Sequence, residues 1–273
     1  MLYIGIDLGT SSCKLLLVDE EGRVLNSVSR EYPLYFPRPG WSEQEPEDWF
    51  AAVCGGIPEL LRGFDASGLE GIGVAGQMHG LVCLDSRGQV VRPAILWNDG
   101  RTSAEVDYLN GAVGRQTLSQ HTANIAFAGF TAPKLLWLKN NEPENFSRIE
   151  KIMLPKDYIN YRLTGVHACE PSAASGPPLY DVERRCWSRP ILELCGVSEA
   201  PMPRLFESGE VIGSVLPELA ERLGLPQRLK VVAGAGDNAA PAPGTGTVGR
   251  GKDNISSATS GTIFITSATI STY

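Results

Sequence analysis

The sequence predicts an α/β fold in which a mixed β-sheet is flanked by helices. Short β-rich runs joined by turns open the chain at residues 3–32, and apolar runs typical of buried strands occupy 69–75 and 230–235. Helical patterns fill much of the interval between them. Strand runs that alternate with helical patterns are typical of a sheet covered by helices. A length of 273 residues, 42% of them hydrophobic, suits one large domain or two ordinary ones.

The first elements are predicted from turns and helix signals. Residues 3–7, 14–19 and 23–32 are β-rich and are separated by tight turns, so they predict a three-stranded antiparallel meander. Pro46 opens a helical pattern next to acidic residues, which favour the start of a helix. Pro58 weakens this prediction, because proline is unfavourable inside a helix.

The later elements follow from the same patterns. Residues 81–85 and 92–96 are predicted as strands, and the region 101–163 as mostly helical. An amphipathic pattern over 211–223 predicts one further helix. The β-rich run 255–269 predicts the start of a second meander.

Composition excludes several classes of function. A net charge of -7 gives no electrostatic reason to bind nucleic acid or an anionic membrane. Apolar runs such as Leu15–Val18 are too short to span a bilayer, and the first apolar stretch contains Asp7 and lacks a basic leader. Six scattered cysteines without a C-x-x-C pair are typical of reduced thiols. We therefore expect a soluble, cytoplasmic protein.

The first motif with chemical meaning is Asp7–Ser12, between two predicted strands. Such a turn brings backbone N–H groups and hydroxyls to one point, as anion-binding nests do. Gly9 permits close backbone approach, and an aspartate at a strand end can hold a hydrated Mg²⁺ near phosphate groups. The alternative is an ordinary hairpin turn with a capping aspartate. The motif is not a Walker loop, because G-K-[ST] is absent.

The second motif is Asp237, in a glycine-flanked turn at the end of the predicted strand 230–235. Phosphoryl transfer to an alcohol needs a group of this kind to orient the hydroxyl and accept its proton. The alternative is a turn aspartate that caps a following helix.

The third motif combines Gly76–Gly80 with Trp97–Asp99, some twenty residues on. Polar side chains at strand ends supply the several hydrogen bonds that a polyol requires, and a flanking Trp or Met covers its apolar face. The alternative places His79 as a core or capping histidine and Met78 in the core.

Taken together and in this order, these segments resemble the FGGY family of carbohydrate kinases, within the actin, hexokinase and Hsp70 superfamily. The resemblance runs over nearly the whole chain. It is carried by Tyr3–Ser12, Trp41–Pro46, Gly73–Gly80, Arg92–Arg101, Gly129–Trp137, Leu154–Tyr158 and Gly234–Ala240. The strings at 77–80 and 97–101 are similar to those of family members that act on D-xylulose.

The resemblance implies a ribonuclease-H-like core in each of two domains with a cleft between them. Residues 1–245 would form an N-terminal sugar-binding domain, and 246–273 the beginning of a C-terminal nucleotide-binding domain that is cut short. D-xylulose would bind chiefly to the first domain, and ATP with Mg²⁺ chiefly to the second. The reaction would transfer the γ-phosphate of ATP to the 5-hydroxyl of D-xylulose. A homodimer is also implied.

The resemblance further assigns roles to single residues. Asp237 would be the general base that takes the proton from the 5-hydroxyl, and Asp7 would help to place Mg²⁺ through water. The sugar contacts would be Met78, His79, Asp237 and Asn238, with Trp97 and Asp99 nearby. The phosphate contacts would be Gly9, Thr10 and Ser11 in the first loop and Thr259, Ser260, Gly261 and Thr262 in the second.

Three segments depart from the family pattern. Pro171–Pro178 replaces an acidic-polar run in a loop that lines the cleft. Pro241 and Pro243 stand where a helix would start, and Pro243 is the harder one to accommodate. Ala258 replaces the glycine that usually opens the second phosphate loop.

Because the chain stops soon after the second loop, we expect weak kinase activity or none from it alone. One alternative is a non-catalytic sugar-binding module. Another is a chaperone- or actin-like ATPase, which only the loop at 7–12 supports. Within the kinases, L-ribulose, gluconate or another polyol remains an alternative substrate.

Overall fold

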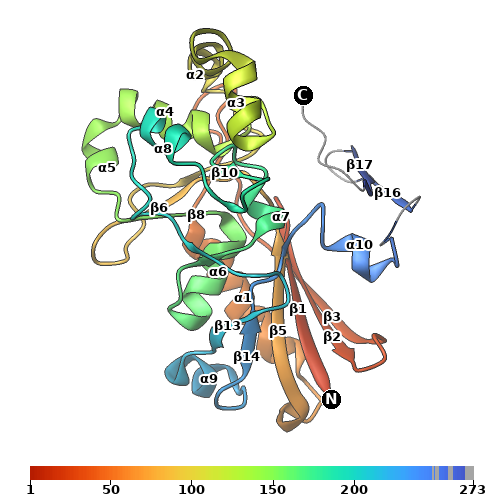
Figure 1. Cartoon of the computed structure of the whole chain (residues 1–273). Helices are drawn as coiled ribbons and strands as arrows, with labels where there is room; N and C mark the ends of the chain where they lie inside the picture. The colour runs from red at the N-terminus through yellow and green to blue at the C-terminus, as the bar shows by residue number, and fades with distance from the viewer. Residues whose placement is uncertain (248, 250–251, 258–260, 268–273) are drawn as a thin grey trace.

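The computed structural model describes residues 1–247, 249, 252–257 and 261–267. Within these residues, seven strands form a mixed sheet in the order β13-β14-β5-β1-β2-β3, with β15 also paired to β5 (Figure 1). The strands are β1 (Leu2–Leu8), β2 (Ser12–Asp19), β3 (Val24–Glu31), β5 (Leu69–Gly76), β13 (Val211–Ser214), β14 (Lys230–Val232) and β15 (Ala235–Gly236). The α/β prediction with a mixed, helix-flanked sheet is confirmed.

Helices cover this sheet and build a second layer beside it (Figure 1). The α-helices are α1 (Pro46–Leu60), α2 (Ser103–Asp107), α3 (Arg115–Thr122), α4 (Thr131–Asn141), α5 (Pro143–Ser147), α6 (Pro155–Thr164), α7 (Pro171–Ala174), α8 (Arg189–Cys195), α9 (Pro217–Leu223) and α10 (Pro241–Gly244). A 3₁₀ turn, η1, spans Ala66–Gly68, and a π-helical segment, η2, spans Tyr108–Gly114.

The remaining strands form separate two-stranded pairs. They are β4 (Glu43–Gln44) with β7 (Ala94–Ile95), β6 (Val82–Leu84) with β8 (Lys151–Met153), β9 (Ala168–Cys169) with β12 (Arg204–Leu205), β10 (Tyr180–Asp181) with β11 (Cys186–Trp187), and β16 (Asp253–Ser257) with β17 (Gly261–Ile265). The strands predicted at 81–85 and 92–96 are confirmed in shorter form as β6 and β7, and β16 and β17 overlap the β-rich run at 255–269.

The N-terminal meander forms as predicted. β1 pairs antiparallel with β2, and β2 pairs antiparallel with β3. Helix α1 packs on β2 and β3, with Gly56 facing Leu15 so closely that a Cβ on the glycine would lie 2.7 Å from the leucine Cδ1. Pro58 lies inside α1, where it removes one backbone N–H from the helix, and its side chain is exposed.

The predicted helix over 211–223 is wrong in its first half. Val211–Ser214 is a strand that pairs antiparallel with β14, and only Pro217–Leu223 is helical. The β-branched Val211 and Ile212 suit an edge strand, and the partner strand lies some twenty residues further along the chain. A local periodicity cannot detect that partner, whereas Pro217 begins the true helix at its first position.

Two hydrophobic clusters form the core. The larger joins the sheet to α1, α6 and α9, and includes Trp49 and Tyr158, which are almost fully buried. The smaller lies among α3, α4 and α8, and includes Trp137 and Leu138. All six cysteines are free thiols. Within the described ranges, no helix is long and apolar enough to cross a membrane.

Candidate functional site

Three parallel strand ends meet at one edge of the sheet. β1 and β15 lie on the two sides of β5, with Leu8 and Gly236 both opposite Gly76. The residues that follow these strands therefore come together although they are far apart in sequence. They form three loops, namely 9–12 after β1, 77–80 after β5 and 237–240 after β15. In open α/β sheets, ligands bind outside the carboxyl ends of strands.

A break in the third strand sets the position of Asp237. The predicted strand 230–235 is divided into β14 and β15, because Gly234 has a φ of 83°. A side chain at Gly234 would clash with the Val74 carbonyl oxygen, so only glycine fits this close approach. After the break, the Asp237 N–H donates to the Gly76 carbonyl at 3.0 Å. The carboxyl group is thereby carried on backbone fixed to the central strand.

The Asp7 carboxylate acts electrostatically on Asp237. Burial and the nearby Asp7 carboxylate raise the pKa of Asp237 to about 6. The Asp7 side chain is in contact with solvent, but the protein atoms packed around its carboxyl group raise its pKa. The positive charge of Lys14 lowers the same pKa by a smaller amount. The sequence placed both aspartates at strand ends, and the structure brings them to the same edge.

The predicted sugar contacts Met78 and Asn238 also lie together. The Asn238 side-chain amide is 4.0 Å from the Met78 sulfur. A Cβ at Gly236 would lie 2.7 Å from the same sulfur, so Met78 packs directly on the backbone before Asp237. Met78 is buried, whereas Asn238 is exposed. This arrangement offers an apolar surface beside an amide and a carboxyl group, as a sugar requires.

His79 is held in an unusual conformation. Its φ is 69°, and its ring stacks on Phe130 with centroids 4.5 Å apart. Its carbonyl oxygen accepts hydrogen bonds from Thr131 Oγ1 at 3.0 Å and from the buried Lys134 Nζ at 2.8 Å. Burial and the Lys134 charge lower the pKa of His79 to about 3, so the imidazole is neutral at physiological pH.

The first loop is fixed by buried glutamines. Gln44 Nε2 donates to the Thr10 carbonyl at 2.8 Å, and Gln77 Nε2 is 3.3 Å from the Gly9 carbonyl. The Gly9 N–H closes the turn by donating to the Ser12 carbonyl at 3.0 Å. Gly9 thus shapes the loop, while Thr10 and Ser11 form its outer side. Gln44 could not be recognised from the sequence, because its role depends on a contact between distant segments that no local pattern shows.

Trp97 and Asp99 make different contacts from Met78 and His79. Trp97 Nε1 donates to Thr10 Oγ1 at 2.9 Å, so the indole braces the first loop. Asp99 is buried and both of its carboxylate oxygens are occupied, one by the Ser42 N–H at 2.6 Å and both by the Arg101 guanidinium. The structure therefore does not bring Asp99 to the exposed side of the site. Its carboxylate anchors the neighbouring segment instead.

The second loop is only partly described. Thr259, Ser260 and the departure at Ala258 lie outside the described residues. Gly261 and Thr262 begin β17, which pairs with β16 in the register Ser257↔Gly261. Of the two predicted phosphate loops, only the first lies wholly within the described residues.

The two prolines after Asp237 are accommodated in a single helical turn. α10 begins at Pro241 and contains Pro243. The first four N–H groups of a helix have no partner within it, so neither proline removes a hydrogen bond. The expected difficulty at Pro243 is resolved by the shortness of α10.

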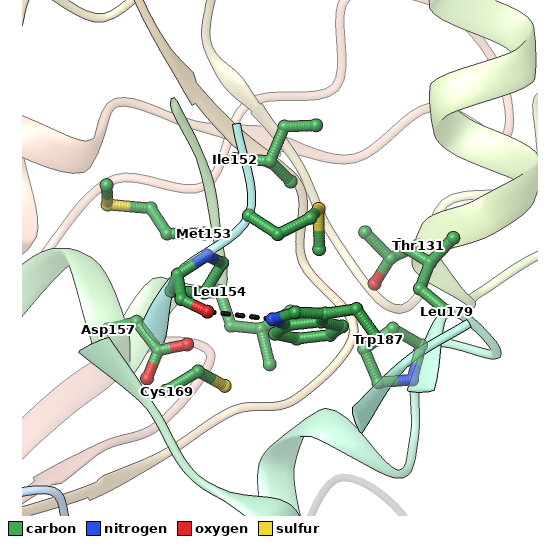
Figure 2. A pocket seen from close by; sticks show the side chains of 11 residues that line it. Thr131, Ile152, Met153, Leu154, Asp157, Cys169, Leu179 and Trp187 are labelled. Atoms are coloured by element: carbon green, nitrogen blue, oxygen red, sulfur yellow. Dashed lines mark hydrogen bonds between the residues drawn. The ribbon is translucent and has the colours of Figure 1, made fainter. Parts of the chain in front are cut away.

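A narrow pocket lies next to Thr131, whose hydroxyl bonds the His79 carbonyl, and it is too small for a sugar. It has a volume of about 10 Å³, which is close to the space of one water molecule. Figure 2 shows its largely apolar lining, with Trp187 hydrogen-bonded to the Pro203 carbonyl. This pocket therefore has no room for a pentose.

Mg²⁺ prefers oxygen ligands and keeps several of its waters. Asp7 provides a carboxylate beside the hydroxyl-bearing first loop, and its repulsion with Asp237 is the kind that a cation would relieve. No group of three or more metal-binding side chains occurs among the described residues. The donor set fits an ion held through water and substrate oxygens.

Comparison with known proteins agrees with this geometry. Residues 2–244 match the model of the FGGY family of carbohydrate kinases, N-terminal domain. The chain therefore belongs to this family. A xylulose kinase from Escherichia coli (strain K12) is 43% identical over 266 residues, which are 97% of this chain and 54% of that protein. The chain thus spans about half the length of such relatives.

Solved structures of kinases that are named for different sugars have the same fold as this chain. A xylulose kinase from Rhodospirillum rubrum has a TM-score of 0.94 at 30% identity, covering 100% of this chain and 56% of that one. A gluconate kinase from Lactobacillus acidophilus has a TM-score of 0.91 at 28% identity, covering 96% and 53%. Both structures support the fold and the sugar-kinase class, but backbone similarity does not separate the two substrates.

Proposed function

We propose that this chain is the sugar-binding part of an ATP-dependent kinase that phosphorylates the 5-hydroxyl of D-xylulose. The observation that carries the proposal is the meeting of Asp237 with the loops at 9–12 and 77–80, at the carboxyl edge of the sheet. The similarity to xylulose kinases supports the choice of sugar. Residues 1–245 would form the sugar-binding domain and 246–273 the start of a nucleotide-binding domain.

Asp237 would act as the general base. A base works best when its pKa lies near the working pH, and the pKa of Asp237 is raised to about 6. Its carboxylate would orient the 5-hydroxyl and accept the proton as the oxygen attacks the γ-phosphate. Asn238 and the neutral His79 would hydrogen-bond other hydroxyls, and Met78 would pack on the carbon skeleton.

The first loop would face the transferred phosphate. Thr10 and Ser11 lie on its outer side, and Asp7 stands at its base. Asp7 would hold Mg²⁺ through water, and the ion would neutralise phosphate charge. Trp97, Gln44 and Gln77 keep the loop in place, so little reorganisation is needed when substrate binds.

Isothermal titration with D-xylulose tests this function. We expect saturable binding that Mg-ATP leaves unchanged and that Asp237→Ala weakens roughly 10- to 100-fold, the effect of losing a hydrogen bond to a charged group. Asp65→Ala is a matched control, because Asp65 caps η1 near the start of β5, at the opposite end of the strand. Binding that Asp237→Ala leaves intact would contradict the assignment.

Other sugars separate the remaining alternatives. Tighter binding of gluconate or L-ribulose would replace D-xylulose as the substrate. Saturable sugar binding without turnover is expected both of the sugar-binding part of a kinase and of a non-catalytic sugar-binding module, so it excludes only the ATPase. A nucleotide response without any sugar dependence would favour an ATPase. Robust phosphorylation of D-xylulose by the 273-residue chain would overturn the expectation of weak activity.

A further inference from the structure

The segment 170–178 touches both sides of the site. The Gly236 N–H donates to Ser172 Oγ at 3.0 Å, and Gly236 directly precedes Asp237. At the other end of the segment, Gly176 lies against the His79 ring so closely that a side chain there would clash with it. One short stretch of chain therefore contacts the backbone beside the proposed base and a proposed sugar contact. Figure 1 shows α7 at the end of the sheet where β1 and β5 finish.

Glu170 makes this segment rigid. It is fully buried, and its carboxylate accepts the N–H groups of Ser172 at 2.7 Å and Ala173 at 2.9 Å, capping α7. Ser208 Oγ donates to the same carboxylate at 3.1 Å. The buried Lys156 also lies beside this carboxylate, with its Nζ 3.5 Å from Glu170 Oε1. A buried, paired carboxylate of this kind holds its partners in one geometry.

The same lysine also reaches the strand that leads to Asp237. Lys156 Nζ lies 3.3 Å from the Ala233 carbonyl and 2.7 Å from Asp157 Oδ1. Asn160 Nδ2 donates to the Ala233 carbonyl at 2.9 Å. Helix α6 thus fixes residue 233 directly, and fixes residue 236 through Glu170 and Ser172. The break at Gly234 lies between these two anchored points.

β15 needs such an anchor. It is two residues long, and in the main sheet it pairs with β5 alone. The Gly236 N–H points to Ser172 instead of to another strand. Without the hydroxyl this buried donor would lose its acceptor, which favours movement of the backbone. Because Asp237 is the next residue, such movement would displace its carboxyl group.

We propose that Ser172 is a positioning residue for Asp237, acting through the hydrogen bond from the Gly236 N–H. In this role Ser172 acts on the backbone before Asp237 and does not contact the substrate. The functional consequence depends on the proposed role of Asp237, but the positioning itself is measurable without any sugar. The proline-rich departure at 171–178 is then a scaffold that keeps the required hydroxyl in place.

The first test measures the backbone. In Ser172→Ala, amide hydrogen exchange followed by NMR is expected to be roughly 2- to 10-fold faster at Gly236, matching the loss of one net hydrogen bond. Ser172→Thr retains a hydroxyl and should restore protection. Ser175→Ala is the control, because Ser175 Oγ bonds the Ser172 carbonyl at 3.0 Å within the same segment. It should leave the exchange at Gly236 unchanged. Equal Gly236 protection in Ser172→Ala and wild type would overturn the proposal.

The second test measures D-xylulose affinity in the same four proteins. Weaker binding in Ser172→Ala, recovered in Ser172→Thr, would extend the positioning role to sugar binding. Wild-type affinity in Ser172→Ala, with faster exchange at Gly236, would overturn that extension. If wild type binds no sugar, the proposed function fails, while the exchange data still decide whether Ser172 fixes Gly236.

Discussion

Neutralising Asp237 should make the protein more stable at neutral pH while removing the proposed base. The pKa of Asp237 is about 6, against an ordinary value of 3.8, so folding retains a proton that the unfolded chain releases. The difference of 6 − 3.8, about 2.2 units at about 1.4 kcal/mol each, corresponds to about 3 kcal/mol. Partial exposure of Asp237 reduces this to about 1–2 kcal/mol.

The stability contribution of Asp237 should change with pH in a defined direction. Because the pKa is raised on folding, the native state binds more protons between the two values, and stability falls as pH rises from about 4 to about 6. Above that window both states are ionised and the penalty is complete. Asp237→Asn removes it, so the gain should be largest near pH 7.5 and small near pH 4.

Urea unfolding at these two pH values, without added metal or nucleotide, measures the effect. Asp85→Asn is a matched control, because backbone hydrogen bonds from Gln89 and Arg87 lower the pKa of Asp85, so its neutralisation gives no gain. An Asp237→Asn protein that is no more stable than wild type near pH 7.5 would refute the electrostatic account of this site.

Three further predictions concern other parts of the chain. Gly234→Ala should lower the free energy of unfolding in urea by at least about 2 kcal/mol, because the new Cβ would clash with the Val74 backbone. Gly22 also has a positive φ but lies in open space, so Gly22→Ala should lower it by only about 1 kcal/mol. The His79 imidazole should titrate in NMR only near pH 3, and a midpoint near 6.5 would show that it is not buried against Lys134. Ile263 is 67% exposed on β17, and an exposed apolar strand can pair with a second copy of the chain. Replacing it with lysine should therefore reduce concentration-dependent light scattering, and unchanged scattering would exclude this strand as the site of self-association.

Much of the site could be predicted because its residues follow strands directly. The runs before Asp7, Gln77 and Asp237 are apolar and β-rich, and polar residues at strand ends are visible in the sequence. Their convergence required parallel pairing of β1 and β15 with β5, which the pairing register shows and no local pattern indicates. The contacts of Asp99 could be seen only in part, since Arg101 is two residues away but Ser42 lies 57 residues away.

By itself, the sequence determined the antiparallel meander, helix α1 and the motifs at the strand ends, because these depend on neighbours a few residues apart. Tertiary structure alone decided that Val211–Ser214 is a strand, since its partner β14 supplies the missing hydrogen bonds. It also decided that Gln44 holds the first loop and that Ser172 receives the Gly236 N–H. Those contacts satisfy buried polar groups across long sequence separations, and such pairing exists only when the whole chain is folded.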